Sequence, residues 1–128
     1  MQNKYGIDFY ETMDVANSYL DLLEDNINSL KNKYIDKPEK LENELNCMKN
    51  DYDKVYHFED LLYVYLDAQD YQSVANQLVM IDMLHAMMRD VLPSTDLSDL
   101  SDYLESLSER QLIDEVTRVI DKFNEEVM

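Results

Sequence analysis

Apolar residues recur every three or four positions through the first part of the chain, which is the period of an amphipathic helix. Asp8 is suited to cap the first turn, and Glu11, three residues later, completes a capping-box pattern. The apolar positions form one narrow stripe: Phe9, Met13, Ala16, Leu20, Leu23, Ile27, Leu30 and Tyr34. Such a stripe packs against one neighbouring helix with coiled-coil-like geometry. The pattern predicts a helix over about 8–35.

A second helix with the same rhythm is predicted over about 37–67. Pro38 cannot continue the first helix but suits the first turn of the next one. The rhythm breaks once, where Glu59 occupies a position of the stripe and Phe58 replaces it. Two stripes of about 28 residues each, joined by a tight turn, predict an antiparallel hairpin about 40 Å long. The apolar positions of the second stripe are Leu41, Leu45, Met48, Tyr52, Val55, Leu62 and Leu66.

Apolar residues dominate from Val55 to Leu92, including the unbroken run 61–66. A helix that is apolar on several faces needs neighbours on several sides, so the open end of the hairpin is expected to lie in a bundle. Asp70 is expected to cap a central helix over 71–92, and two shorter helices are predicted over 95–106 and 109–127, the last opened by a Ser108–Gln111 capping box. The prediction is one all-α domain, 1–128, with a coiled-coil-like stalk and a five-helix bundle.

The composition supports an all-helical fold. The 128 residues include one Gly and two Pro, too few for the turns of a sheet protein. No run of eighteen apolar residues is present, so no membrane span is expected, and residues 1–8 lack a charged-then-apolar secretory pattern. Cys47 is the single cysteine, which fits the reducing cytoplasm, the host cytoplasm if the chain is phage-encoded.

The charge distribution restricts the partners. The net charge is −17, from 28 acidic and 11 basic residues, and no Lys or Arg lies between Val55 and Met88. Residues 1–30 carry −5, residues 31–54 are neutral, and residues 55–128 carry −12. Direct binding to nucleic acid or an anionic membrane requires the opposite sign, whereas a basic protein partner fits. The alternative is that the acids only keep the surface soluble.

Candidate catalytic and cofactor chemistry is sparse, so no enzyme activity, cofactor or metal is expected. The one glycine, Gly6, is not part of a phosphate-binding loop. His57 with Asp60 and His85 with Asp82 are spaced as metal ligands. If the second and third helices turn around 67–70, however, the two histidines lie about 9 Å apart along the helix axes, too far for one metal cluster. The segment 96–105 resembles a calcium loop in its carboxylates, but Leu100 stands at the position of the third ligand and Ser101 at the position of the required glycine.

The candidate partner-binding residues are acids from Glu59 to Asp70 and from Asp96 to Glu109, together with two tyrosines of the second helix. The acids would replace phosphates opposite Lys and Arg of a partner, while the tyrosines add contact area with a polar tip. The candidates are Asp96, Asp99, Asp102, Glu105, Glu109, Glu59, Asp60, Asp67, Asp70, Tyr56 and Tyr63.

Two functions remain open from the sequence. The first is a non-catalytic module that binds and blocks a basic, nucleic-acid-binding protein surface. Small acidic phage inhibitors, including some anti-CRISPR and other DNA-mimic proteins, act this way as a class, although no motif here matches a particular member. The second is a structural or adaptor protein that forms a homodimer through its coiled-coil hairpin.

Overall fold

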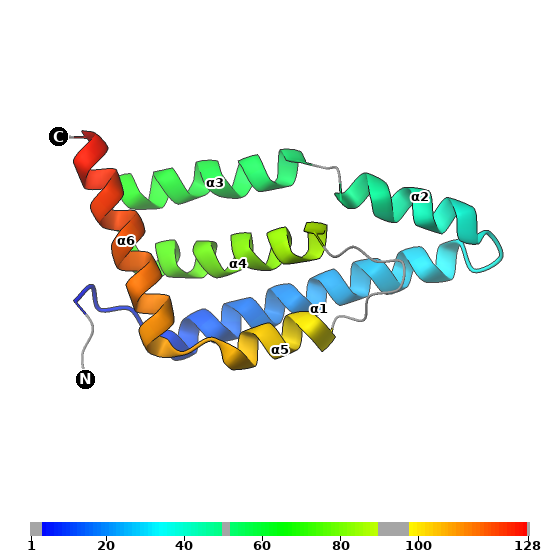
Figure 1. The fold of residues 1–128 in the computed structure, drawn as a ribbon, viewed down its shortest axis with the longest axis horizontal. Coiled ribbons are helices and arrows are strands. Elements are labelled where there is room, and N and C mark those ends of the chain that lie inside the picture. The colour runs from blue at the N-terminus through cyan, green and yellow to red at the C-terminus, as the bar shows by residue number, and fades with distance from the viewer. Residues whose placement is uncertain (1–3, 50–51, 90–97, 128) are drawn as a thin grey trace.

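The computed structural model describes residues 4–49, 52–89 and 98–127, and in these residues the regular structure is entirely helical (Figure 1). The all-α class predicted from the sequence is therefore confirmed. Six helices are described, with these bounds: α1 Phe9–Lys33, α2 Pro38–Lys49, α3 Tyr52–Asp67, α4 Tyr71–Arg89, α5 Ser98–Ser106 and α6 Glu109–Val127.

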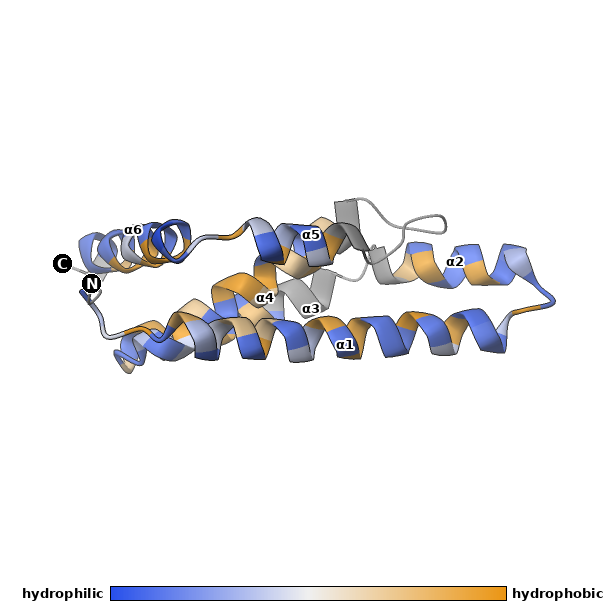
Figure 2. Cartoon of the chain, turned by 90° about the horizontal axis from the view of Figure 1, so that it is seen from below, coloured by the Kyte–Doolittle hydropathy of each residue, from blue (hydrophilic) through white to orange (hydrophobic). Residues whose placement is uncertain are grey.

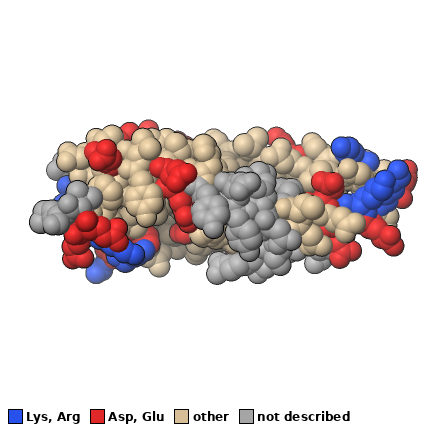
Figure 3. Space-filling view, turned by 90° about the horizontal axis from the view of Figure 1, so that it is seen from above, with Lys and Arg blue, Asp and Glu red and all other residues tan. Residues whose placement is uncertain are grey.

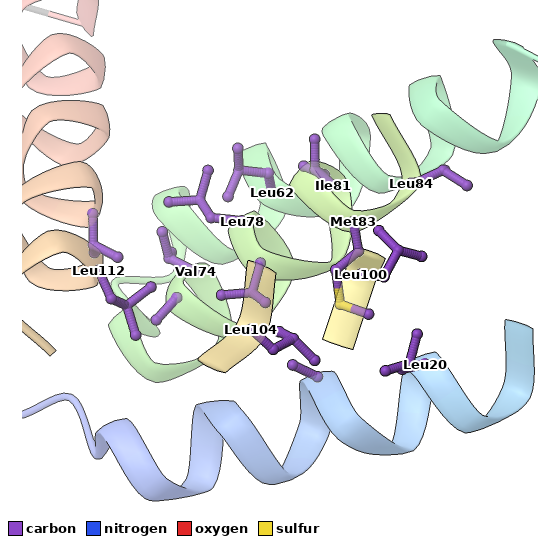
Figure 4. Close-up of a cluster of buried hydrophobic side chains, with 14 of the residues drawn as sticks. Leu20, Leu62, Val74, Leu78, Ile81, Met83, Leu84, Leu100, Leu104 and Leu112 are labelled. Carbon is purple, nitrogen blue, oxygen red and sulfur yellow. The ribbon is translucent and has the colours of Figure 1, made fainter. Parts of the chain in front are cut away.

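Helix α4 is the centre of the arrangement, because it packs against each of the other five helices (Figure 1). It lies between α3 on one side and α1 with α5 on the other, while α6 crosses the end where α4 begins. Leu62 of α3, Leu78 of α4 and Leu104 of α5 meet in the same buried cluster (Figure 4). Val74, Val79, Met83 and Leu84 point to different sides of α4 and are all buried, which agrees with a helix that has neighbours on several sides.

The structure departs from the predicted full-length hairpin. The expected helix 37–67 is described as two helices, α2 and α3, which lie on either side of residues 50 and 51, outside the described part. Helix α2 returns alongside α1, whereas α3 pairs mainly with α4 (Figures 1 and 2). Because α4 is apolar on most faces, inserting it between α1 and α3 buries more apolar surface than a direct seam between those two helices would.

Local signals in the sequence account for where the helices begin. Asp8 accepts hydrogen bonds from the backbone N–H groups of Tyr10 and Glu11, which caps α1 as predicted. Ser108 and Gln111 form the predicted reciprocal capping box before α6, with distances of 3.0 and 3.1 Å. Pro38 is the first residue of α2, a position whose N–H has no acceptor within the helix, so the lack of an N–H in proline costs no hydrogen bond.

The turn between α3 and α4 is a Schellman motif with an uncommon residue at its centre. The N–H of Asp70 donates to the carbonyl of Tyr65 at 3.0 Å, and that of Gln69 donates to the carbonyl of Leu66 at 3.1 Å. Gln69 has a φ of 59°, in the left-handed region that glycine usually occupies at this position. The turn brings α4 back against α3 without any additional loop.

All eight apolar positions of the stripe predicted on α1 are buried or half-buried, so that prediction is confirmed. The apolar run 61–66 is only partly buried. Leu62 and Leu66 are buried against α4, but Tyr63 is 55% exposed and Val64 is 60% exposed. The reason is that α4 covers only one side of α3, and α6 reaches only the end of the other side.

Candidate functional site

The outer face of α3 combines acidic and apolar side chains. Asp60, Tyr63, Val64 and Asp67 are all exposed and are spaced by three, four and seven residues, so they share one face of the helix. We call these four residues the α3 stripe. Three of them were predicted as contact residues from the sequence. Val64 was not among the predicted contact residues.

The tyrosine of the α3 stripe is held in place by α6. Its ring lies 6.4 Å from the ring of Phe123, centroid to centroid, at an interplanar angle of 41°. Phe123 is itself half-buried against the core. An aromatic ring that is supported from one side and open on the other offers contact area without a large loss of side-chain entropy on binding.

Lysine and arginine side chains are scarce on this side of the molecule. Figure 3 views the side on which α3 lies, and among the described atoms the blue groups gather at the two ends. Toward the α6 end, several Asp and Glu side chains (red) are visible, with uncharged surface (tan) between them. Helix α3 from Val55 onward and α4 up to Met88 contain no Lys or Arg, so no cation on these segments neutralises the carboxylates.

Helix α5 carries the second group of predicted acids. Asp102 and Glu105 are exposed and three residues apart on this helix, and Glu109 is exposed at the start of α6. Asp96 lies outside the described residues, as do the side chains of Asp99 and Tyr56. The structure thus describes only the C-terminal half of the acidic stripe predicted on this segment, and there the acids are exposed.

A polar contact absent from the sequence predictions fixes α5 to α4. The hydroxyl of Tyr103 donates to Asp82 at 3.2 Å. Burial raises the pKa of Tyr103 to about 12, and the negative charges of Asp82 and Glu115 act in the same direction. Within α6 the guanidinium of Arg118 donates to Glu115. The only sequence signal for the contact between Tyr103 and Asp82 was Asp82 itself, an acid within an otherwise apolar segment.

Two of the predicted acids are placed less favourably for a partner than the others. Asp70 caps α4, because its carboxylate accepts from the N–H and the hydroxyl of Ser73 at 3.2 and 2.8 Å. Glu59 is half-buried rather than exposed. Asp70 therefore stabilises the start of α4 rather than facing a partner.

The predicted acids that the structure describes do not form one continuous surface. Those of α3 and those of α5 belong to helices that pack on different sides of α4 (Figure 1). The structure instead presents two separate acidic faces, and the face on α3 also carries exposed apolar side chains.

The described residues show no further chemical site. Among them, no group of three or more His, Cys, Asp or Glu side chains could hold a metal ion. Within the same residues, every buried side-chain nitrogen or oxygen has a hydrogen-bond partner, so no orphaned group points to a bound ligand. None of the helices in the described part is both long enough and apolar enough to cross a bilayer.

No protein-family model, curated protein or solved structure matches the chain.

Proposed function

We propose that this chain is a non-catalytic, acidic binding protein that docks on a basic surface of another protein, such as its nucleic-acid groove, and blocks it. In this mode the carboxylates occupy the positions of phosphates opposite Lys and Arg of the partner, in the cytoplasm. The chain would then be a DNA-mimic inhibitor, of the kind that phages use against defence systems such as CRISPR.

The observation that carries the proposal is the absence of Lys and Arg from 55 to 88 together with the exposure of Asp60 and Asp67 on α3. Like charges gathered on one part of a small domain destabilise its compact state through self-repulsion. A compensating benefit arises when a basic partner neutralises the field, because electrostatic complementarity accelerates association and selects the partner.

The test begins with capture of partners from a nuclease-treated lysate of the cells that express the gene. The bait is the wild-type chain, and the comparison baits are Asp60→Lys/Asp67→Lys on α3 and Asp102→Lys/Glu105→Lys on α5. The matched control is Asp21→Lys/Asp25→Lys, which reverses two exposed charges on α1. A partner that depends on the α3 or α5 acids, but not on the α1 acids, is expected.

The captured partner is then purified and its own nucleic acid is added as a competitor. We expect the nucleic acid to displace the chain and the affinity to fall as salt rises. If nucleic acid and the chain bind the partner together without competition, the blocking mechanism is wrong.

Self-association through the hairpin is the second candidate, and two exposed apolar residues favour it. Leu22 on α1 is 55% exposed, and Ile35 in the turn before α2 is 75% exposed. Contacts of this kind respond little to salt. Sedimentation velocity of the purified chain decides between the two candidates: a dimer that persists at high salt supports self-association, and a monomer supports the acidic binding protein.

A further inference from the structure

The α3 stripe has a more specific pattern than a general acidic surface. Its two carboxylates are seven residues apart, which is about 10 Å along the helix axis, and the two exposed apolar side chains lie between them. A flexible basic tail would be attracted by the carboxylates but would leave Tyr63 and Val64 in water. A partner that covers all four residues must present apolar groups flanked by cations.

We infer that the α3 stripe is a docking site for an amphipathic helix of a partner protein, with two apolar residues flanked by a Lys or Arg on each side. The inference rests on the proposed function, since it specifies which face meets the basic partner and what that partner presents. On such a helix the cations stand at positions i and i+7 and the apolar residues at i+3 and i+4, which repeats the spacing of the α3 stripe.

The charge and the geometry of α3 both favour this occupant over a second copy of the chain. A second copy would bring another net charge of −17 toward a face that already carries uncompensated carboxylates. The exposed side of a helix offers ridges and grooves that accept the side chains of another helix, as α4 already does on the opposite side of α3. Tyr63 is supported by Phe123, so part of the apolar contact is formed before the partner arrives.

The experiment uses the full chain and two synthetic peptides with identical composition and net charge. In the first peptide, lysines at i and i+7 flank leucines at i+3 and i+4 of an alanine-based helix. In the second, the same residues are permuted so that the leucines and lysines lie on different faces. Binding is measured by fluorescence anisotropy at low and moderate salt, and sedimentation velocity reports the oligomeric state of the chain.

Val64→Asp tests the apolar part of the α3 stripe, and Asp60→Asn/Asp67→Asn tests its charges. The matched controls are Leu22→Asp, which alters an equally exposed apolar residue on α1, and Asp21→Asn/Asp25→Asn on the same helix. Circular dichroism and urea unfolding establish that each variant is folded.

We expect the first peptide to bind about tenfold more tightly than the second, and either α3 variant to remove most of that difference. The α1 variants should change binding by less than about twofold. Equal binding of the two peptides, or equal losses in the α3 and α1 variants, would show that only the general acidic field is used; the docking site is then wrong and the proposed function stands. Binding of neither peptide, with no basic partner captured, would overturn both. A concentration-dependent dimer that Val64→Asp dissociates would make the face a contact between copies of this chain and overturn the inference.

Discussion

The side chain of Gln72 on α4 accepts the backbone N–H of Asp8 at 2.6 Å and so completes the N-terminal cap of α1. The sequence predicted that Glu11 would accept this N–H, as in a capping box, and that half of the prediction is wrong. Gln72 also donates from Nε2 to the hydroxyl of Thr12 at 2.7 Å, and Thr12 is fully buried. The start of α1 is thereby joined to the first turn of the central helix, 64 residues away.

Gln72→Ala should lower the free energy of unfolding by about 1–2 kcal/mol, because it leaves the N–H of Asp8 and the hydroxyl of Thr12 without these partners. Urea unfolding measures the loss, and hydrogen exchange should show faster opening of the first turn of α1. Gln111→Ala is the matched control, since it removes a cap contact within one helix and should cost no more than about 1 kcal/mol.

A double-mutant cycle with Thr12→Val isolates the contact between the two side chains. The valine keeps the methyl group and removes the hydroxyl, so the losses in the two single variants should not add, with a coupling of about 0.5 kcal/mol or more. Simple additivity would mean that Gln72 acts on α1 through the backbone of Asp8 alone.

Gln69→Gly should stabilise the protein by about 0.5–1 kcal/mol. Gln69 has a φ of 59° at the centre of the Schellman turn, a conformation that costs a residue with a Cβ atom more than it costs glycine. Part of this gain is offset by the greater freedom of glycine in the unfolded chain. The urea midpoint reports the change. Asn124→Gly, at an exposed position inside α6, is the control and should destabilise slightly, by about 0.3 kcal/mol; stabilisation by both variants would contradict the explanation.

The parts of the fold that were predicted from the sequence are those set by short-range periodicity. The stripe of α1 was correct throughout, because a spacing of three and four specifies one buried face whatever helix covers it. On α6 a spacing of three or four from Val116 leads to either Val119 or Ile120; Val119 is half-buried, whereas Ile120 is 2% exposed. Adjacent apolar residues can each satisfy the helical period, so only the packing partner decides between them.

Long-range choices were not available from the sequence. Periodicity could not show that α4 would separate α1 from α3, since each helix carried a face suited to either neighbour. For the same reason Gln72 and Tyr103, whose partners are distant in the sequence, gave no recognisable signal. At the candidate site, the acids of α3 were predicted from charge, but the exposure of Val64 follows from which side of α3 the core occupies.

Tyr103→Phe should weaken the loss of stability in alkali. The pKa of Tyr103 is raised from 10.0 to about 12 in the folded protein, so the unfolded state releases its proton first as the pH rises. The contribution is complete below about pH 10 and is lost as the pH approaches 12. Because the side chain is partly exposed, solvent screening limits it to about 1 kcal/mol.

Urea midpoints of the wild type and Tyr103→Phe, measured from about pH 8 to about pH 11.5, should therefore converge with rising pH. The lysines titrate in both proteins alike, so their effect cancels when the urea midpoint of one protein is subtracted from that of the other. Tyr10→Phe, at a ring that is 80% exposed, is the control for loss of one hydroxyl. Curves that stay parallel over the whole range would show that the hydroxyl of Tyr103 keeps its proton no more tightly in the folded state than in the unfolded one.

Salt should stabilise the chain while weakening its complex with a basic partner. In the described residues the exposed ion pairs are Arg110–Asp114 and Glu115–Arg118, both within α6, and surface pairs of this kind contribute little. Repulsion among the carboxylates, at a net charge of −17, is the larger effect, and counterions screen it beyond about 10 Å at 0.1 M salt.

Raising NaCl from about 0.02 M to about 0.5 M should therefore raise the urea midpoint. The variant Asp102→Asn/Glu105→Asn, which removes two exposed charges from α5, should begin with a higher midpoint and respond less to salt. The affinity for a basic partner should change in the opposite direction over the same range, because screening weakens attraction as well as repulsion. If stability fell with salt instead, attractive pairs would dominate the surface, and the charge repulsion on which the proposed function depends would be absent.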